Sequence, residues 1–116
     1  MEKMLKRQRA FAKARDWDQF HTPKNLSMAL AAEAAELLEI FQWLTEKQSK
    51  NIMRQNRQAE AVRHELADIF YYLLRIADLL GVDLETAFEE KMRLNEKKYP
   101  VEKARGTAKK YTQLER

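Results

Sequence analysis

Four carboxylates at helical spacing are the residues in this sequence most able to do chemistry. Glu33 and Glu36 form one pair, and Glu65 and Asp68 form a second pair with the same spacing. Residues three positions apart are neighbours on one helix face, so each pair would present its two carboxylates together. Oxygen ligands without His or Cys suit a hard cation, which predicts Mg²⁺, with Mn²⁺ able to substitute.

The first pair lies beside the apolar stripe of its predicted helix. At 100° per residue, Leu26 and Leu37 fall within about 40° of Leu30 and mark the stripe. Glu33 and Glu36 follow on one flank, at about 60° and 120° from Leu30. We therefore expect both carboxylates at the border between the packed face and solvent.

The second pair repeats this arrangement on a later helix. Glu65 and Asp68 share a flank with Tyr72, beside a predicted core stripe formed by Val62, Leu66, Phe70, Leu73, Ala77 and Leu80. Packing the two stripes together would bring the four carboxylates to one edge of a bundle. Close carboxylates cannot all ionise without a compensating cation. Either pair alone is typical of a solvated helix face, so the metal hypothesis depends on both.

Two polar residues fall on the expected inner face of the last long helix. Lys91 and Asn95 lie within about 20° of Leu84 on the helical wheel. Burying a lysine is costly unless it is paired, so a phosphate group is one candidate partner. A carboxylate partner, or an extended Lys91 side chain that reaches solvent, explains the position equally well.

Aromatic side chains could border a nucleobase pocket. Trp17 and Trp43 could stack on a planar base, although tryptophan in a helical protein is more often part of the core. His21 lies in a predicted loop, where a structural hydrogen bond and a ligand contact are equally reasonable interpretations.

The composition predicts an all-α protein. The 116 residues include two Gly, two Pro and no Cys, and residues with high helix propensity dominate. We expect a four-helix core over residues 2–16, 25–45, 59–80 and 84–99, with residues 47–56 as a connection or the solvated start of the third helix. Gly81 suits a helix C-terminus, Asp83 an N-cap and Pro100 a stop. This predicts a helical catalytic domain over 1–100 and a basic, largely extended tail over 101–116.

Charge and composition exclude several classes of protein. The segments that carry the carboxylates are acidic: residues 16–45 hold five acidic and one basic side chain, and residues 64–102 hold nine and five. Without Cys, neither a disulfide framework nor a thiolate metal site is possible. The charged start lacks the apolar region of a secretory signal, and no stretch approaches the ~20 apolar residues of a membrane span. We expect a cytoplasmic protein with no membrane partner.

Several motifs together resemble a known family. They are the run from Arg15 to Leu26 with Trp17, Phe20 and His21, the run from Glu33 to Trp43, Glu65-Leu-Ala-Asp68, Lys91 to Pro100, and Arg105 to Thr112. In these motifs the chain resembles the MazG-like all-α nucleoside triphosphate pyrophosphohydrolases, and most closely their single-domain dCTP pyrophosphatase branch. The resemblance covers nearly the whole chain.

The resemblance implies a reaction and a set of roles. A deoxynucleoside triphosphate (dCTP or a related one, dATP or a modified dNTP) plus water would give the monophosphate and pyrophosphate, clearing the nucleotide pool. Glu33, Glu36, Glu65 and Asp68 would hold Mg²⁺ and form the catalytic set, with Glu36 orienting or deprotonating the attacking water. The implied substrate-binding residues are Trp17, His21, Asn25, Trp43, Tyr72, Lys91, Asn95 and Tyr99.

One residue departs from the family pattern, and the resemblance also implies an assembly. Relatives associated with dCTP carry a histidine nine residues before the equivalent of Trp17, where this chain has Gln8, which leaves the preferred base open. The family also implies a homotetramer built as a dimer of dimers.

Alternative functions remain compatible with the residues. The same metal site could serve a phosphodiesterase or a nucleoside diphosphatase. A non-catalytic oligomerisation or nucleic-acid-binding module would use the basic ends and bind in a salt-dependent way. Such a module explains neither the paired carboxylates nor the predicted inner position of Lys91, so we expect no stable nucleic-acid complex. A plain helical bundle without any site is the third alternative.

Overall fold

The computed structural model describes residues 1–113, and all regular secondary structure in this range is helical. The predicted all-α class is therefore confirmed. The chain divides into two compact units, Met1–Gly81 and Val82–Arg116, which we describe separately. Residues 114–116, the end of the predicted tail, lie outside the described range.

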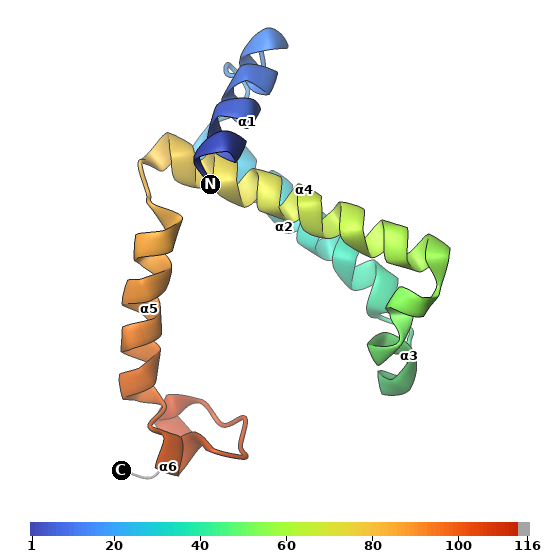
Figure 1. Cartoon of the computed structure of the whole chain (residues 1–116), viewed down its shortest axis with the longest axis vertical. Coiled ribbons are helices and arrows are strands. Elements are labelled where there is room, and N and C mark those ends of the chain that lie inside the picture. Colours follow the sequence, from blue (N-terminus) through green and yellow to red (C-terminus); the bar gives the residue numbers. More distant parts are fainter. Residues whose placement is uncertain (114–116) are drawn as a thin grey trace. The chain divides into compact units, whose positions relative to one another are not determined.

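The first unit is built around two long antiparallel helices. Helices α2 (Pro23–Phe41) and α4 (Asn56–Leu80) lie side by side, and α1 (Glu2–Ala14) crosses α4 near its C-terminal end (Figure 1). The predicted connection between the long helices is itself helical, with a short helix α3 (Glu46–Lys50) and a 3₁₀ turn η1 (Ile52–Arg54).

Local sequence explains where these helices begin and end. Thr22 caps α2, since its hydroxyl accepts a 3.1 Å hydrogen bond from the backbone N–H of Asn25, and Pro23 occupies the first turn. Thr45 and Gln48 form a reciprocal capping box at α3. Gly81 ends α4 with φ of 67°, a left-handed conformation that glycine adopts without steric cost.

The core of the first unit is small, and part of the predicted stripe is not in it. Leu26, Val62 and Ala77 are buried as expected. Leu66 is 51% exposed, however, and Phe70, Leu73 and Leu80 are also exposed in the single chain, which corrects the prediction for these four residues. The reason is geometric: within Met1–Gly81, the elements that pack on α4 are α2, α1 and η1, and they leave one apolar strip of α4 uncovered.

The second unit contains α5 (Leu84–Lys98), one helical turn α6 (Val101–Ala104) and a 3₁₀ turn η2 (Tyr111–Gln113). Asp83 caps α5 as predicted, because its carboxylate accepts a 3.1 Å hydrogen bond from the Thr86 N–H. The tail, expected to be largely extended, thus contains two short helical turns. No helix in the described residues combines the length and apolarity needed to cross a bilayer.

Candidate metal and substrate site

Three of the four predicted carboxylates converge between α2 and α4. One carboxylate oxygen from each of Glu33, Glu36 and Glu65 lies within 4.8 Å of the others. Glu33 and Glu65 are half-buried, whereas Glu36 is exposed. Asp68 is exposed and outside this group, but its negative charge acts on both Glu33 and Tyr72. The antiparallel packing of the two long helices brings these residues together.

The electrostatics of the cluster centre on Glu33. A hydrogen bond with Glu65 raises the pKa of Glu33 to about 7, helped by burial and by the neighbouring charges of Glu36 and Asp68. One oxygen of Glu33 and one of Glu65 are buried without a hydrogen-bond partner among the described residues. Near neutral pH, therefore, the cluster holds a proton that a cation could displace.

The donor set fits a divalent cation. All candidate ligands are carboxylate oxygens, the preferred ligands of hard cations, and two of these oxygens lack any other partner in the described part of the chain. A bound divalent ion would satisfy those oxygens and offset the negative charges of the cluster.

A cavity of about 630 Å³ opens beside the cluster. Glu33 and Asp68 line it on the acidic side. The remaining lining residues come from α1, the following loop and α4, and they are largely apolar or aromatic: Met4, Arg7, Gln8, Phe11, Trp17, Ala67, Phe70, Tyr71, Tyr72 and Leu74. Its size falls within the range of small-molecule sites.

Aromatic rings form one wall of this cavity. Phe11 lies edge-on to Trp17, with ring centroids 5.5 Å apart, and also to Tyr71, at 6.4 Å. Tyr71 in turn lies edge-on to Tyr72 at 5.2 Å. Burial raises the pKa of both tyrosines, and the nearby carboxylates raise that of Tyr72 further, so both hydroxyls stay protonated at neutral pH. The wall can therefore offer stacking surfaces and neutral hydrogen-bond donors.

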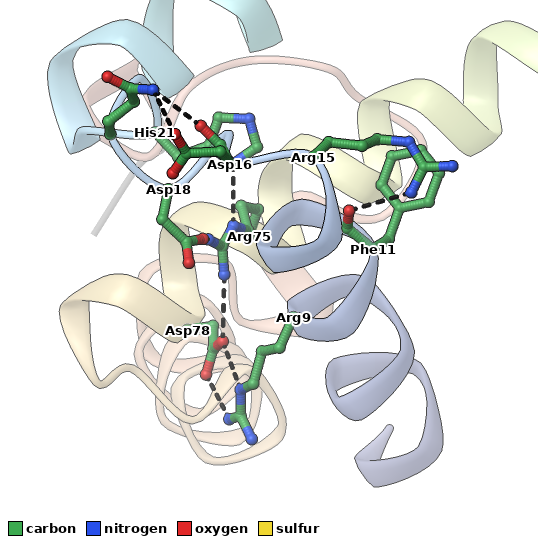
Figure 2. Close-up of polar contacts among 9 residues, drawn as sticks. Arg9, Phe11, Arg15, Asp16, Asp18, His21, Arg75 and Asp78 are labelled. Atoms are coloured by element: carbon green, nitrogen blue, oxygen red, sulfur yellow. Dashed lines mark hydrogen bonds and ion pairs between the residues drawn. The ribbon is translucent and has the colours of Figure 1, made fainter.

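An ion-pair network fixes the loop that carries Trp17 (Figure 2). Arg75 is 4% exposed, and its guanidinium donates to Asp18 at 2.6 Å and to Nδ1 of His21 at 3.1 Å. Asp78, one turn along α4, receives the Arg9 Nε–H at 2.7 Å and lies 3.8 Å from Arg75. Burial and the charge of Arg75 lower the pKa of His21, consistent with a neutral imidazole that accepts from Arg75. The network ties both α1 and the loop to α4.

The predicted substrate residues in the first unit have different environments. Trp17 and Tyr72 line the cavity as expected. His21 takes part in the Arg75 network, and the Asn25 amide donates to the backbone carbonyl of Phe20 at 3.0 Å, so both residues hold the loop. Trp43 follows the end of α2, is 87% exposed and is not among the cavity residues. Substrate contacts for these last three residues remain predictions.

The predicted phosphate-binding residues belong to the second unit. Lys91 and Asn95 lie one turn apart on α5, and Tyr99 is its C-cap residue. Lys91 is exposed and no residue of α5 is buried, so the second unit by itself does not form the expected inner face. The role of all three residues at the substrate remains a prediction.

Sequence reasoning missed Arg75 and Tyr71, and it singled out Gln8 only as a departure from the family pattern. Gln8 and Arg75 are the buried polar residues of the described chain, and Tyr71 lies in the aromatic wall. The signal for Gln8 is its helical spacing from Leu5 and Ala12, which places a polar side chain on the packed face of α1. Arg75 carries no comparable local signal, because its two hydrogen-bond partners, Asp18 and His21, are more than fifty residues away.

Comparison with known proteins identifies the family of this chain. The MazG-like family matches residues 28–114. Rat dCTP pyrophosphatase 1 is 43% identical over 106 residues, and the bovine protein of the same name is 44% identical over 104. These matches cover 91% and 90% of this chain but 62% of each relative, so the chain spans less than two thirds of their length. A crystal structure of a pyrophosphatase from Archaeoglobus fulgidus DSM 4304 has a TM-score of 0.81 and 39% identity, covering 86% of this chain and 92% of that one. The chain belongs to the MazG-like family.

Proposed function

We propose that this protein hydrolyses nucleoside triphosphates to the monophosphate and pyrophosphate. The observation that carries the proposal is the position of the carboxylate cluster at the edge of an aromatic-lined cavity, with Glu33 in both. An acidic cluster binds a phosphate chain only through a cation, and an aromatic wall suits a base. The names of the similar proteins, dCTP pyrophosphatase 1 and a pyrophosphatase, support the same reaction.

Glu33, Glu36, Glu65 and Asp68 would hold Mg²⁺, or Mn²⁺ in its place. When bound, the ion supplies charge neutralisation for the phosphates and lowers the pKa of a ligand water. Glu36 is the exposed member of the converged group, so it can accept a proton from a water that enters from solvent. Glu33 and Glu65 are the half-buried members of the converged group and would anchor the ion from α2 and α4.

The cavity would receive the nucleoside. Trp17 and Phe11 offer faces and edges for a base. Tyr72 lines the cavity and interacts electrostatically with the carboxylates, which suits the sugar and the first phosphate. Lys91 and Asn95 would hold the phosphate chain, as the resemblance implies. We propose a deoxynucleoside triphosphate, dCTP or a related one, as the substrate, in a role of nucleotide-pool clearance.

The protein would act as a homo-oligomer, a tetramer built as a dimer of dimers. Large apolar side chains on the two long helices remain exposed in the single chain, among them Met28, Leu38 and Leu66. The exposure of so many large apolar side chains supports an interface between subunits that would cover them. Light scattering coupled to gel filtration measures the assembly directly, and a monomer at micromolar concentration would contradict it.

Product analysis tests the activity. The chain is incubated with each of the common dNTPs and Mg²⁺, and the products are identified by phosphorus NMR. We expect pyrophosphate and the monophosphate, with turnover abolished by chelation and by Glu36→Gln. Glu39→Gln, an exposed glutamate on the same helix and outside the cluster, is the matched control and should retain turnover. Orthophosphate as the first product, or equal loss in both variants, would contradict the proposal.

A further inference from the structure

A single buried arginine makes the polar contacts between helix α4 and the loop that follows α1. Arg75 lies on α4 and is 4% exposed, and its guanidinium donates to the Asp18 carboxylate at 2.6 Å and to His21 Nδ1 at 3.1 Å (Figure 2). Within Met1–Gly81, no other hydrogen bond or ion pair joins residues 15–22 to α4. The position of this loop against α4 therefore depends on Arg75.

The two partners of Arg75 belong to the turn that carries Trp17. Residues 17–21, which we call the Trp17 turn, are closed by a 3.1 Å hydrogen bond from the His21 N–H to the Trp17 carbonyl. The Trp17 ring lies 6.1 Å from the imidazole of His21 and lines the cavity. Because Arg75 binds this turn at both Asp18 and His21, a loss of these bonds allows Trp17 to move.

The backbone that enters the Trp17 turn is strained. Asp16 has a φ of 53°, in the left-handed region that is unfavourable for a residue with a Cβ. Such a conformation persists only where the surrounding structure holds it. The Gln19 amide supplies a local 2.9 Å bond to the Asp16 carboxylate, whereas Arg75 anchors the turn to a different helix. Without this anchor, the strain favours movement of the turn away from α4.

We propose that Arg75 is a positioning residue for nucleoside binding, which holds the Trp17 turn in its binding position through Asp18 and the neutral imidazole of His21. This inference rests on the proposed function, because it takes the cavity as the nucleoside site. Arg75 does not line that cavity, so it acts on the ligand through the turn and not by contact. The fraction of protein with the turn in place sets the apparent affinity, so release of the turn raises KM.

The bond to His21 makes this positioning sensitive to acid. A guanidinium has only donors, so Arg75 can bond to Nδ1 only while that nitrogen carries no proton. The charged groups of this network are Asp18 on the turn itself, Arg75 and Asp78 on α4, and Arg9 on α1. Burial and the charge of Arg75 lower the pKa of His21, and they outweigh the opposite effect of Asp18. Acid therefore favours the released turn, in which His21 can take up a proton.

Arg75→Lys tests the positioning role while the positive charge is kept. A lysine ammonium lacks the planar fork by which Arg75 donates to Asp18 and His21 together. For the dNTP that is turned over fastest, at saturating Mg²⁺, we expect KM to rise about tenfold, the worth of about one hydrogen bond to a charged group. The value of kcat should be unchanged, because the lost interaction acts on binding.

A matched control separates this role from a loss of stability. Arg63→Lys makes the same exchange at an exposed position of α4 and should keep the natural KM. If Arg75 only stabilised the fold, Arg75→Lys would reduce the fraction of folded enzyme and hence the apparent kcat, and KM would stay the same. That result would overturn the proposal and leave the proposed function intact.

The pH dependence of KM tests the role of His21. At pH 5.5, about one unit below the ordinary pKa of histidine, protonation favours the released turn by at most about tenfold. Between about pH 7.5 and about pH 5.5, KM should rise by up to that factor more in the natural protein than in His21→Asn, whose side chain does not titrate. Taking the ratio of the two proteins removes the titration of Glu33 and of the substrate phosphates, which both share. His64→Asn, at the other histidine, should keep the natural profile. Equal pH dependence in the natural protein and His21→Asn would overturn the role of His21.

Tryptophan fluorescence tests the turn without any turnover. In Trp43→Phe, Trp17 is the remaining tryptophan of the sequence. The Trp17 side chain is 40% exposed, so acrylamide should quench a fully released ring at most about 2.5 times more strongly. We expect stronger quenching in Trp43→Phe at about pH 5.5 than at about pH 7.5, and at both pH values once Arg75→Lys is added.

The fluorescence result separates this inference from the function on which it rests. Quenching that changes neither with acid nor with Arg75→Lys would overturn the hold of Arg75 on the Trp17 turn, whether or not the enzyme is active. If quenching changes as expected but no triphosphate yields pyrophosphate, the proposed function fails and the role in nucleoside binding fails with it, while the hold of Arg75 on the turn stands.

Discussion

Glu33→Gln should stabilise the metal-free protein at alkaline pH and not at acid pH. The pKa of Glu33 is raised from 4.5 to about 7, so the folded protein binds its proton more tightly than the unfolded chain does. Stability from this group is therefore greatest at low pH and falls as the pH rises from about 4.5 to about 7. The amide that replaces the carboxylate in the variant stays neutral throughout, so the variant avoids that loss.

The size of the effect follows from the shift. A rise in the pKa of Glu33 from 4.5 to about 7 corresponds to a change of at most about 3 kcal/mol in the free energy of unfolding, at 1.36 kcal/mol per pKa unit. Glu33 is partly exposed, and solvent screening reduces this to about 1 kcal/mol. We expect Glu33→Gln to be about 1 kcal/mol more stable than the natural protein at about pH 8, with the gap narrowing to a few tenths at about pH 4.5.

Urea unfolding with a chelator, at one protein concentration, measures this difference. Added Mg²⁺ should reverse the order at about pH 8, because an ion that binds only the folded state stabilises the natural protein by mass action and the variant much less. Glu39→Gln is the control and should follow the natural protein in every condition. If Glu33→Gln shows the natural pH dependence and the full response to Mg²⁺, Glu33 is not part of a coupled carboxylate cluster.

Three further substitutions test the scaffold of the site. Arg75→Met should lower the free energy of unfolding, measured by urea titration, by about 2 kcal/mol, because Asp18 and His21 lose their shared partner. Arg63→Met, at an exposed position of the same helix, is the control and should leave the free energy of unfolding unchanged. The pKa of His21 is lowered in the folded protein, so neutral His21 contributes to the free energy of unfolding above pH 6.5, and this contribution is lost as the pH falls below that value. His21→Asn should therefore be least stable relative to the natural protein above pH 6.5. A difference in the free energy of unfolding that stays constant across pH would refute this. Gly81→Ala should lower the free energy of unfolding by about 1 kcal/mol from backbone strain alone, because no atom lies within 4 Å of the added Cβ. An unchanged melting temperature would contradict this strain.

The helices are largely predictable because their signals are local. Gly81 and Asp83 mark the end of α4 and the start of α5 through their own backbone preferences and capping bonds. The spacing of Glu33 and Glu36 predicts both on one face, and the structure brings them to Glu65. The start of α2 lies two residues earlier than expected, at Pro23, because Thr22 rather than a later residue supplies the cap.

The remaining features depend on contacts that sequence spacing does not encode. A helical wheel identifies the apolar face of α4, but not how much of that face another helix of the same chain covers, so Leu66 is predicted in the core and is exposed. The burial of Arg75 depends on Asp18 and His21, which come from a distant loop. The unpaired state of Gln8 can be recognised only once α1 and α4 are placed together.

The most direct test of the central claim is the fate of oxygen from the attacking water. The protein is incubated with a dNTP and Mg²⁺ in water enriched in oxygen-18, and both products are analysed by mass spectrometry. Attack at the α-phosphorus, as we propose for the carboxylate cluster of Glu33, Glu36, Glu65 and Asp68, predicts one labelled oxygen in the monophosphate and none in the pyrophosphate. Label in the pyrophosphate, or in orthophosphate released from the triphosphate, would contradict this claim.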